Sequence, residues 1–228
     1  MHSQRTFQTS MAIGAITACA VGLACQTSDI EISQSFQNIR IPGDLKKAIG
    51  LSETFAHSSG GIVIFATLLW IDVKNRLKLW QAAFFTLICG IAANAAKLIV
   101  PRYRPHSLDQ SEIEILSSWQ TWGTPGTGSW FDEQLRSFPS GHAAVAVAFA
   151  IGLSQVYPRG KWIFASLATM ACLQRIVSNA HFFSDIMAGI VIPLVISLWY
   201  WKSSSFSKSD NDRELHESTH LPASLTIE

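Results

Sequence analysis

Charge is what this sequence has least of. Asp, Glu, Lys and Arg make up 14% of its 228 residues, against about 25% in a typical soluble domain. The net charge is only +1, so there is no strongly basic surface of the kind that binds nucleic acid. Too few charged side chains remain to cover a surface that faces water, and the mean hydropathy is +0.24. The composition predicts an integral membrane protein, and no nucleic acid partner is expected.

Cysteine is also scarce, and its spacing indicates neither a disulfide framework nor a zinc site. Cys19, Cys25, Cys89 and Cys172 each lie in an apolar run, with no CxxC pair among them. Buried thiols behave as small hydrophobic side chains. We therefore expect four buried cysteines, no bound metal and no cofactor.

Long apolar runs, in contrast, are abundant. A membrane-spanning helix needs about 20 mostly apolar residues, and six segments approach that length. They run from about Phe7 to Cys25, Phe55 to Ile71, Leu79 to Val100, His142 to Tyr157, Lys161 to Ser178 and Ser184 to Trp201. The sequence thus predicts an all-α fold, a polytopic membrane bundle of about six transmembrane helices over residues 1–201, followed by a flexible cytoplasmic tail at 202–228. It indicates no oligomeric state.

Two short basic connections, at residues 72–78 and 158–161, predict the orientation. Short loops rich in Lys and Arg stay in the cytoplasm, so we expect both termini there and the other three connections outside. Aromatic residues flank the two basic loops, as is typical of a membrane interface. The start of the chain also fits a cleaved signal peptide ending near residues 18–20, and both interpretations stay open.

Ionisable side chains near membrane depth are the next signal. A charge at the centre of a spanning helix costs at least about 2.5 kcal/mol, so such residues are candidates for function. The candidates all lie near the predicted outer ends of segments, and we expect them to converge on one pocket. They are Lys97, Arg102, Arg104, Arg136, His142, Arg175, His181 and Asp185.

The pattern of these residues suits phosphate. Lys97 and Arg104 are nearly two helical turns apart, and a guanidinium such as that of Arg175 binds phosphate oxygens in bidentate fashion. Residues 139–142, Pro-Ser-Gly-His, read as a turn that opens a helix, where backbone N–H groups and the helix dipole favour an anion. The sequence predicts a phosphate site.

Two histidines add reactive groups to that site. His181 and Asp185 are four residues apart, so the carboxylate can hold one ring nitrogen and leave the other free as a nucleophile. His142 can protonate a leaving alcohol, because imidazole carries a proton near neutral pH. These roles are the ones that phosphoryl transfer requires.

Three motifs then show a family resemblance. A lysine is followed after six residues by Arg-Pro at residues 97–105, Pro-Ser-Gly-His stands at 139–142, and Arg175 precedes His181 and Asp185 with five and three residues between them. The sequence resembles the type 2 phosphatidic acid phosphatase (PAP2) and vanadium haloperoxidase superfamily. Gln174 departs from the serine that usually precedes this arginine, which bears on subfamily rather than on reaction.

The resemblance implies a metal-independent lipid phosphatase. It implies that His181 forms a phosphohistidine, His142 protonates the leaving oxygen and Asp185 orients His181. The residues implied to bind phosphate are Lys97, Arg104, Ser140, Gly141 and Arg175. A bacterial inner membrane with the site on the periplasmic face is expected, and phosphatidic acid, phosphatidylglycerophosphate, polyprenyl diphosphate and lipid A all stay open as the lipid phosphate partner.

Two other functions stay open beside this one. A non-catalytic protein that binds or transports a lipid phosphate would use the same cradle. A vanadium-dependent haloperoxidase would hold vanadate there, but those relatives are soluble and larger, so the spanning segments count against it.

Several residues lack a motif position. Surface roles for Arg102 and Arg136 are as plausible as phosphate contact, His57 is expected to pack structurally, and His106 is expected in a loop. The connection 106–138 is long enough for a lid. Its Trp119, Trp122 and Trp130 suit the bilayer interface, whereas Asp109, Glu112 and Glu114 suit repulsion of anionic ligands.

Overall fold

The structure, a computed structural model, describes residues 2–108, 117–124 and 132–219. Within these ranges the regular secondary structure is helical, which confirms the predicted all-α fold. The α-helices are α1 (His2–Cys25), α2 (Asp29–Asn38), α3 (Gly43–Leu51), α4 (Glu53–Ala56), α5 (Ser58–Ile71), α6 (Arg76–Ile99), α8 (Gly141–Val156), α9 (Lys161–Val177) and α10 (Phe183–Thr219).

Helix lengths decide how many segments can span a membrane. Among the described residues, three helical stretches are long and apolar enough, namely Arg5–Asn38, Val73–Ile99 and Phe183–Trp201. Gly43–Ala56 and Ser58–Ile71 would form a fourth span if the pair, bent by 70°, counts as one. Helix α8 is apolar but has only 16 residues. The predicted number of six spans is therefore not confirmed.

The second predicted segment is broken, and the break has a local cause. His57 between α4 and α5 adopts an extended conformation (φ −92°, ψ 141°), and its ring accepts a hydrogen bond from the backbone N–H of Ser59 at 3.3 Å. A side chain that caps the first N–H groups of a helix in this way marks a helix start. Helix α5 thus begins at Ser58 instead of continuing α4.

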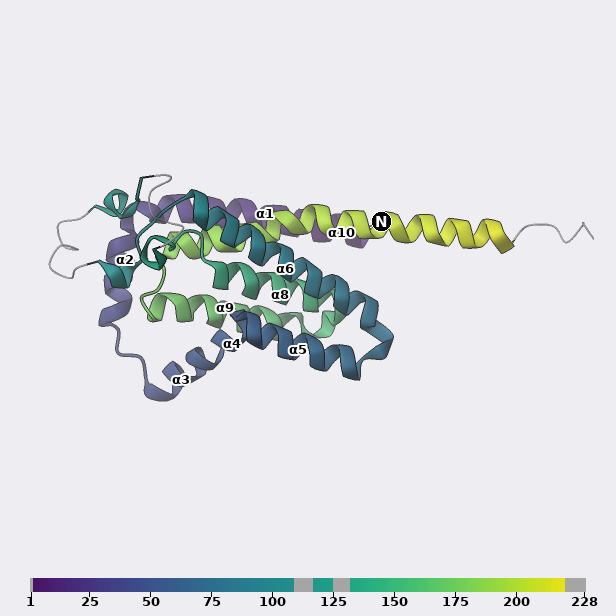
Figure 1. The fold of residues 1–228 in the computed structure, drawn as a ribbon, viewed down its shortest axis with the longest axis horizontal. Coiled ribbons are helices and arrows are strands. Elements are labelled where there is room, and N and C mark those ends of the chain that lie inside the picture. Colours follow the sequence, from purple (N-terminus) through teal and green to yellow (C-terminus); the bar gives the residue numbers. More distant parts are fainter. Residues whose placement is uncertain (1, 109–116, 125–131, 220–228) are drawn as a thin grey trace, which may run out of the picture.

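The long helices lie side by side, with α8 between α6 and α9 (Figure 1). Helix α1 packs along α10, and α8 packs against both α6 and α9. The start of α1, the α5–α6 turn and the α8–α9 turn lie at one end of the bundle, and α3 and the α9–α10 connection lie at the other. This arrangement agrees with the predicted pairing of the N-terminus with the two basic loops. The split between a 1–201 domain and a flexible tail stays a prediction, while α10 itself runs on to Thr219.

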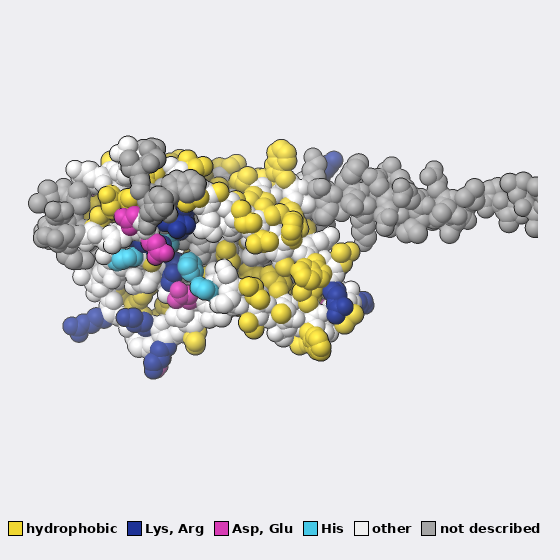
Figure 2. Space-filling model, viewed as in Figure 1, with side chains coloured by type: hydrophobic (Ala, Val, Ile, Leu, Met, Phe, Trp, Pro, Cys, Tyr) yellow, Lys and Arg dark blue, Asp and Glu magenta, His cyan; other side chains and the backbone are white. Residues whose placement is uncertain are grey.

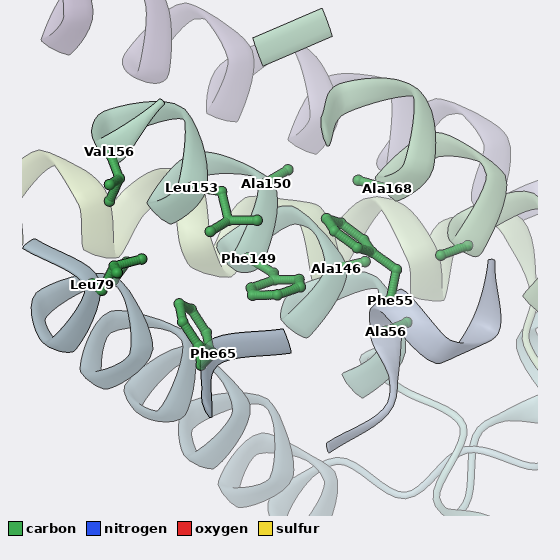
Figure 3. Close-up of a cluster of buried hydrophobic side chains, with 12 residues drawn as sticks. Phe55, Ala56, Phe65, Leu79, Ala146, Phe149, Ala150, Leu153, Val156 and Ala168 are labelled. Atoms are coloured by element: carbon green, nitrogen blue, oxygen red, sulfur yellow. The ribbon is translucent and has the colours of Figure 1, made fainter. Parts of the chain in front are cut away.

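Aromatic and small side chains build the core between α4, α5 and α8 (Figure 3). The ring of Phe149 lies 4.6 Å from that of Phe55 and 4.7 Å from that of Phe65, measured between centroids. Helices α8 and α6 approach each other closely at Gly152, where an added Cβ would lie only 3.0 Å from the Cβ of Ala82. Small residues at such contacts let helix backbones approach each other.

Two of the four cysteines depart from the expected burial. Cys89 and Cys172 are buried, but Cys19 is exposed and Cys25 is half-buried, and all four are free thiols. Cys19 borders a groove between α1 and α10, and Cys25 is the last residue of α1. The prediction of four buried thiols is wrong for these two.

A buried arginine connects the N-terminal part of the chain to α10. The Arg102 side chain is 0% exposed, and its two terminal nitrogens bind Asp29 Oδ2 at 2.7 Å and Asp185 Oδ1 at 2.6 Å. It also donates to Ser184 Oγ at 2.7 Å and to Thr121 Oγ1 at 3.1 Å. Of the two roles left open for Arg102, the structure supports neither a surface position nor a free guanidinium for phosphate, because the side chain is buried against two carboxylates from distant segments.

Two aromatic rings pack against the same guanidinium. Its central carbon lies 4.5 Å from the Trp122 ring centroid and 4.4 Å from that of Phe182. Stacking on aromatic faces stabilises a guanidinium that has lost its water. Trp122 is thus half-buried, with its ring packed against Arg102 and Phe138.

Replacing Asp29 with Ala tests this network. Removing one partner of a buried ion pair leaves an uncompensated charge, so we expect the free energy of unfolding to fall by about 3–5 kcal/mol. Thermal unfolding in detergent micelles measures the loss. Glu31→Ala, at an exposed position on the same helix, is the matched control, and equal melting temperatures for the two variants would contradict the expectation.

Candidate active site

A polar cavity of about 300 Å³ lies where α6 ends and α5 and α8 begin. Charged and histidine side chains gather over this end of the bundle, and apolar side chains cover its middle (Figure 2). The lining residues are Ala56, His57, Ser58, Asn94, Lys97, Arg104, Glu133, Arg136, Gly141, His142 and Val145. Four of the eight predicted site residues are among them. A larger cavity of about 650 Å³, between α8, α9 and α10, is lined mainly by apolar side chains and lacks the three motifs' charged residues.

Two cations of the first motif are anchored at the cavity by backbone carbonyls. Lys97, in the last turn of α6, is 6% exposed and donates from Nζ to the Arg136 carbonyl at 3.1 Å. Arg104 lies beyond the end of the helix and donates from Nε to the Glu133 carbonyl at 3.1 Å. Burial lowers the pKa of Arg104, and Glu133 opposes that change. Each bond uses one donor, so both side chains keep other donors for an anion.

The second motif forms the start of α8. Ser140 is fully buried, and its Oγ accepts from the backbone N–H of Ala143 at 3.4 Å. Its own N–H donates to the Asp185 carbonyl at 2.9 Å. Gly189 of α10 packs directly on this turn, because a Cβ there would lie 2.4 Å from the Ser140 carbonyl oxygen. Gly141 and His142 border the cavity at the positive end of the helix dipole, whereas Ser140 acts as the helix cap and does not line the cavity.

His181 lies between α9 and α10 and is 2% exposed. Its Nδ1 is 3.8 Å from Asp185 Oδ2, which is too long for a hydrogen bond. Ser137 stands between them: its Oγ donates to Asp185 Oδ2 at 2.6 Å and lies 3.4 Å from His181 Nδ1. A proton on Nδ1 can therefore be shared with Ser137, which leaves the lone pair on Nε2.

Burial also decides the protonation of His181. It lowers the pKa of the ring to about 4, and the charges of Lys97 and Arg104 act in the same direction, whereas Asp185 opposes them. The imidazole is thus neutral at neutral pH. Neither His181 nor Asp185 lines the cavity, but Lys97 and Arg104 are close enough for their charges to reach the ring.

Arg175 of α9 completes the third motif. It is 8% exposed, and its Nη1 lies 3.3 Å from His142 Nε2, which joins it to the cavity wall. Its Nη2 donates to Glu53 Oε1 at 2.8 Å. Glu53 comes from α4, so the site draws on a segment that precedes the first motif.

The structure adds residues that the motifs did not identify. Ser137 and Glu53 contact motif residues directly, yet a serine in a loop and a glutamate at a helix start carry no signal in a single sequence. His57 lines the cavity, with its ring centroid 6.0 Å from that of His142, and it also caps α5, so it combines a structural role with a place at the site. Arg136 lines the cavity too.

The long connection after the first motif is only partly described. His106 is exposed in a short 3-10 helix, Pro105–Ser107, which confirms its placement in the loop. Trp119 is 61% exposed. The remaining predictions for this connection fall on Asp109, Glu112, Glu114 and Trp130, which lie outside the described residues. Within the described part of the chain, no three His, Cys, Asp or Glu side chains are grouped to hold a metal ion.

Two curated relatives match half and about three quarters of the chain. A lipid A 1-phosphatase of Rhizobium etli is 26% identical over 193 residues, which cover 77% of this chain and 76% of that protein. A lipid A 1-phosphatase of Rhizobium johnstonii is 30% identical over 117 residues, covering 50% of this chain and 43% of the relative.

Solved structures share the fold. The transmembrane PAP2 type phosphatidylglycerolphosphate phosphatase of Bacillus subtilis superposes with a TM-score of 0.53 at 19% identity, over 89% of this chain and 96% of that one. Aquifex aeolicus LpxE superposes with a TM-score of 0.54 at 20% identity, over 75% and 93%.

These likenesses agree with the apolar helices in making the chain an integral membrane protein. The family model described as the PAP2 superfamily matches residues 78–208, a range that holds all three motifs and the cavity's main cations. The chain belongs to the PAP2 superfamily.

Proposed function

We propose that this membrane protein is a lipid phosphatase that removes a phosphate group through a phosphohistidine at His181, without a metal ion. One observation carries the proposal. Lys97, Arg104, Gly141 and His142 line one cavity, and the positive charges of Lys97 and Arg104 act on the buried imidazole of His181. Phosphoryl transfer needs mainly positioning and positive charge around the phosphate oxygens, and the cavity supplies both.

In the first step, His181 Nε2 attacks phosphorus and the bond from phosphorus to the lipid oxygen breaks. The lone pair is on Nε2 because Nδ1 faces Ser137, which in turn donates to Asp185. His142 gives its proton to the departing lipid oxygen, so the lipid leaves as an alcohol. Lys97, Arg104, Arg175 and the start of α8 neutralise the negative charge on the phosphoryl oxygens.

In the second step, water attacks the phosphohistidine. His142, now neutral, accepts a proton from that water as the new oxygen–phosphorus bond forms. The phosphorus–Nε2 bond breaks, inorganic phosphate is released, and His181 and His142 return to their starting states. Ser140 supports this chemistry as the cap that fixes the start of α8, rather than through its hydroxyl.

We favour a lipid A phosphate as the substrate. Both curated relatives are lipid A 1-phosphatases, and one of them matches across three quarters of each chain. Phosphatidic acid, phosphatidylglycerophosphate and polyprenyl diphosphate are the competing substrates, and the first two share the phosphate monoester chemistry.

We further propose a bacterial inner membrane, with the cavity at the periplasmic face and the tail 202–228 in the cytoplasm. The basic loops at 72–78 and 158–161 lie at the opposite end of the bundle from the cavity, which supports this orientation under the positive-inside rule.

Substitution of the two histidines tests the reaction. We expect purified protein in detergent with EDTA to release inorganic phosphate from lipid A faster than from the three competing lipids. His181→Ala should abolish release, and His142→Ala should lower kcat by about 10²–10⁴-fold because the leaving oxygen loses its proton donor. His106→Ala, in the exposed loop, is the control. Lipid binding without release in the unaltered protein would favour the non-catalytic alternative.

Titration of His181 tests its role as nucleophile. Burial lowers its pKa to about 4, so the ring should stay neutral as pH falls from 7 and gain a proton only below about pH 5. The ring resonances in an NMR titration, assigned by their loss in His181→Ala, report this directly. A midpoint near the ordinary value of about 6.5 would contradict the expectation.

Cysteine labelling tests the orientation. In a background with all four native cysteines changed to Ala, we expect Asp44→Cys on α3 to react with a membrane-impermeant maleimide in spheroplasts. Lys74→Cys in the α5–α6 turn should react only after permeabilisation. Both positions are exposed and lie at opposite ends of the bundle, so the reverse pattern would refute the proposed orientation.

A further inference from the structure

Glu53 makes contacts that the three motifs do not account for. It stands on α4, outside the residues matched by the family model. Its Oε1 accepts from Arg175 Nη2 at 2.8 Å and lies 3.9 Å from His142 Nε2. One carboxylate thus faces both a phosphate-site arginine and the proposed general acid.

Gln174 fixes this carboxylate in place. Its Nε2 donates to Glu53 Oε2 at 3.0 Å, and its Oε1 accepts from Arg175 Nε. Glu53, Gln174 and Arg175 therefore form a closed ring of hydrogen bonds. A serine, which is usual at this position in the family, has a single hydroxyl on a shorter side chain and lacks the two separate groups that close the ring.

The closed ring of hydrogen bonds determines where the Arg175 guanidinium points. Nε and Nη2 are occupied by Gln174 and Glu53, so Nη1 is the nitrogen that remains toward His142, at 3.3 Å. A planar guanidinium held at two of its nitrogens cannot turn. The orientation of Arg175 beside the phosphate cavity thus depends on Glu53.

The charges around His142 give the carboxylate a second effect. Burial opposes protonation of the His142 ring most strongly, and the positive charges of Arg175 from α9 and Lys97 from α6 add to that effect. His57 from the start of α5 and His181 also face the ring. Glu53 is the carboxylate within 4 Å of that ring among the described residues. An opposite charge at this distance favours the charged form of a histidine.

We propose that Glu53 is a positioning residue of this active site, which aims Arg175 at the phosphate and supplies the counter-charge for the protonated form of His142. The inference rests on the proposed function, in which His142 must carry a proton when the lipid oxygen departs. Gln174 supports Glu53 in this role and accounts for the departure of this chain from the family pattern.

The alternative is that Glu53 merely competes with phosphate for Arg175. Its side chain is 39% exposed, so a substrate phosphate could displace it. Removing the charge would then strengthen phosphate binding, lower KM and leave the pH profile where it was. The two roles therefore predict opposite results.

Glu53→Gln tests the proposal because it keeps the shape of the side chain and removes its charge. We expect the basic limb of the pH profile of kcat to move to lower pH by about one unit. At pH values above this limb kcat should be about tenfold lower, and KM should not rise. Gln174→Ser should instead loosen Arg175, raising KM with little movement of the limb. Glu31→Gln, exposed on α2, is the matched control with an unchanged profile.

Three results would overturn the proposal: an unmoved pH profile, a lower KM with higher kcat/KM, or a loss of kcat that only follows a loss of folded protein in a melting curve. An NMR titration separates this test from that of the proposed function. The His142 ring should bind its proton at lower pH in Glu53→Gln than in the unaltered protein, whether or not the protein hydrolyses any of the lipids. Absence of hydrolysis in the unaltered protein contradicts the proposed function, and an unmoved His142 titration contradicts the role of Glu53.

Discussion

The burial of the Arg102 charge is the constraint on which the rest of the structure depends. A guanidinium removed from water is tolerated only when carboxylates pair with it and its donors are satisfied. Asp29 and Asp185 provide the pairing from positions 156 residues apart in sequence, at the start of α2 and in the first turn of α10. The N-terminal segment, the first motif and α10 must therefore assemble together, since none of the three can bury its charge alone.

The Asp185 carboxylate connects this ion pair to the proposed nucleophile, His181. Arg102 holds Asp185 Oδ1, so Oδ2 is left for Ser137 and for the backbone N–H of Phe182 at 2.9 Å. Ser137 then meets His181 Nδ1. His181 is thus oriented by a series of contacts that begins at the buried Arg102–Asp185 ion pair and passes through Ser137. The direct His181–Asp185 hydrogen bond that the four-residue spacing suggests is not formed, because the two atoms are 3.8 Å apart. Because α10 begins at Phe183, His181 precedes the helix, and the i, i+4 geometry does not apply in full.

The sequence predicts helices that appear as apolar runs and site residues that match a motif. It does not predict contacts between residues that are far apart in the chain. Apolar runs placed the ends of the long helices within a few residues, except that α10 runs on to Thr219 instead of ending near Trp201. Motif spacing placed Lys97 and His142 on one cavity. The bend at His57 escaped prediction because a histidine that caps a helix resembles any other histidine in an apolar run. Asp29 and Glu53 escaped because each finds its arginine more than 70 residues away, and one sequence alone carries no signal for such a pair.

Helix length explains why the cavity suits a lipid rather than a soluble phosphate ester. Helix α8 has 16 residues, which at about 1.5 Å per residue reach about 24 Å, whereas the hydrocarbon core is about 30 Å thick. If Tyr157 and the basic α8–α9 turn lie at the inner interface, as proposed, His142 stops about 6 Å short of the outer boundary. The phosphate of a membrane lipid lies just above that boundary, so it has to move only a short distance to meet the start of α8. A short central helix thus ends close beneath the headgroup region, and the phosphate can bind while the lipid tails stay in the bilayer.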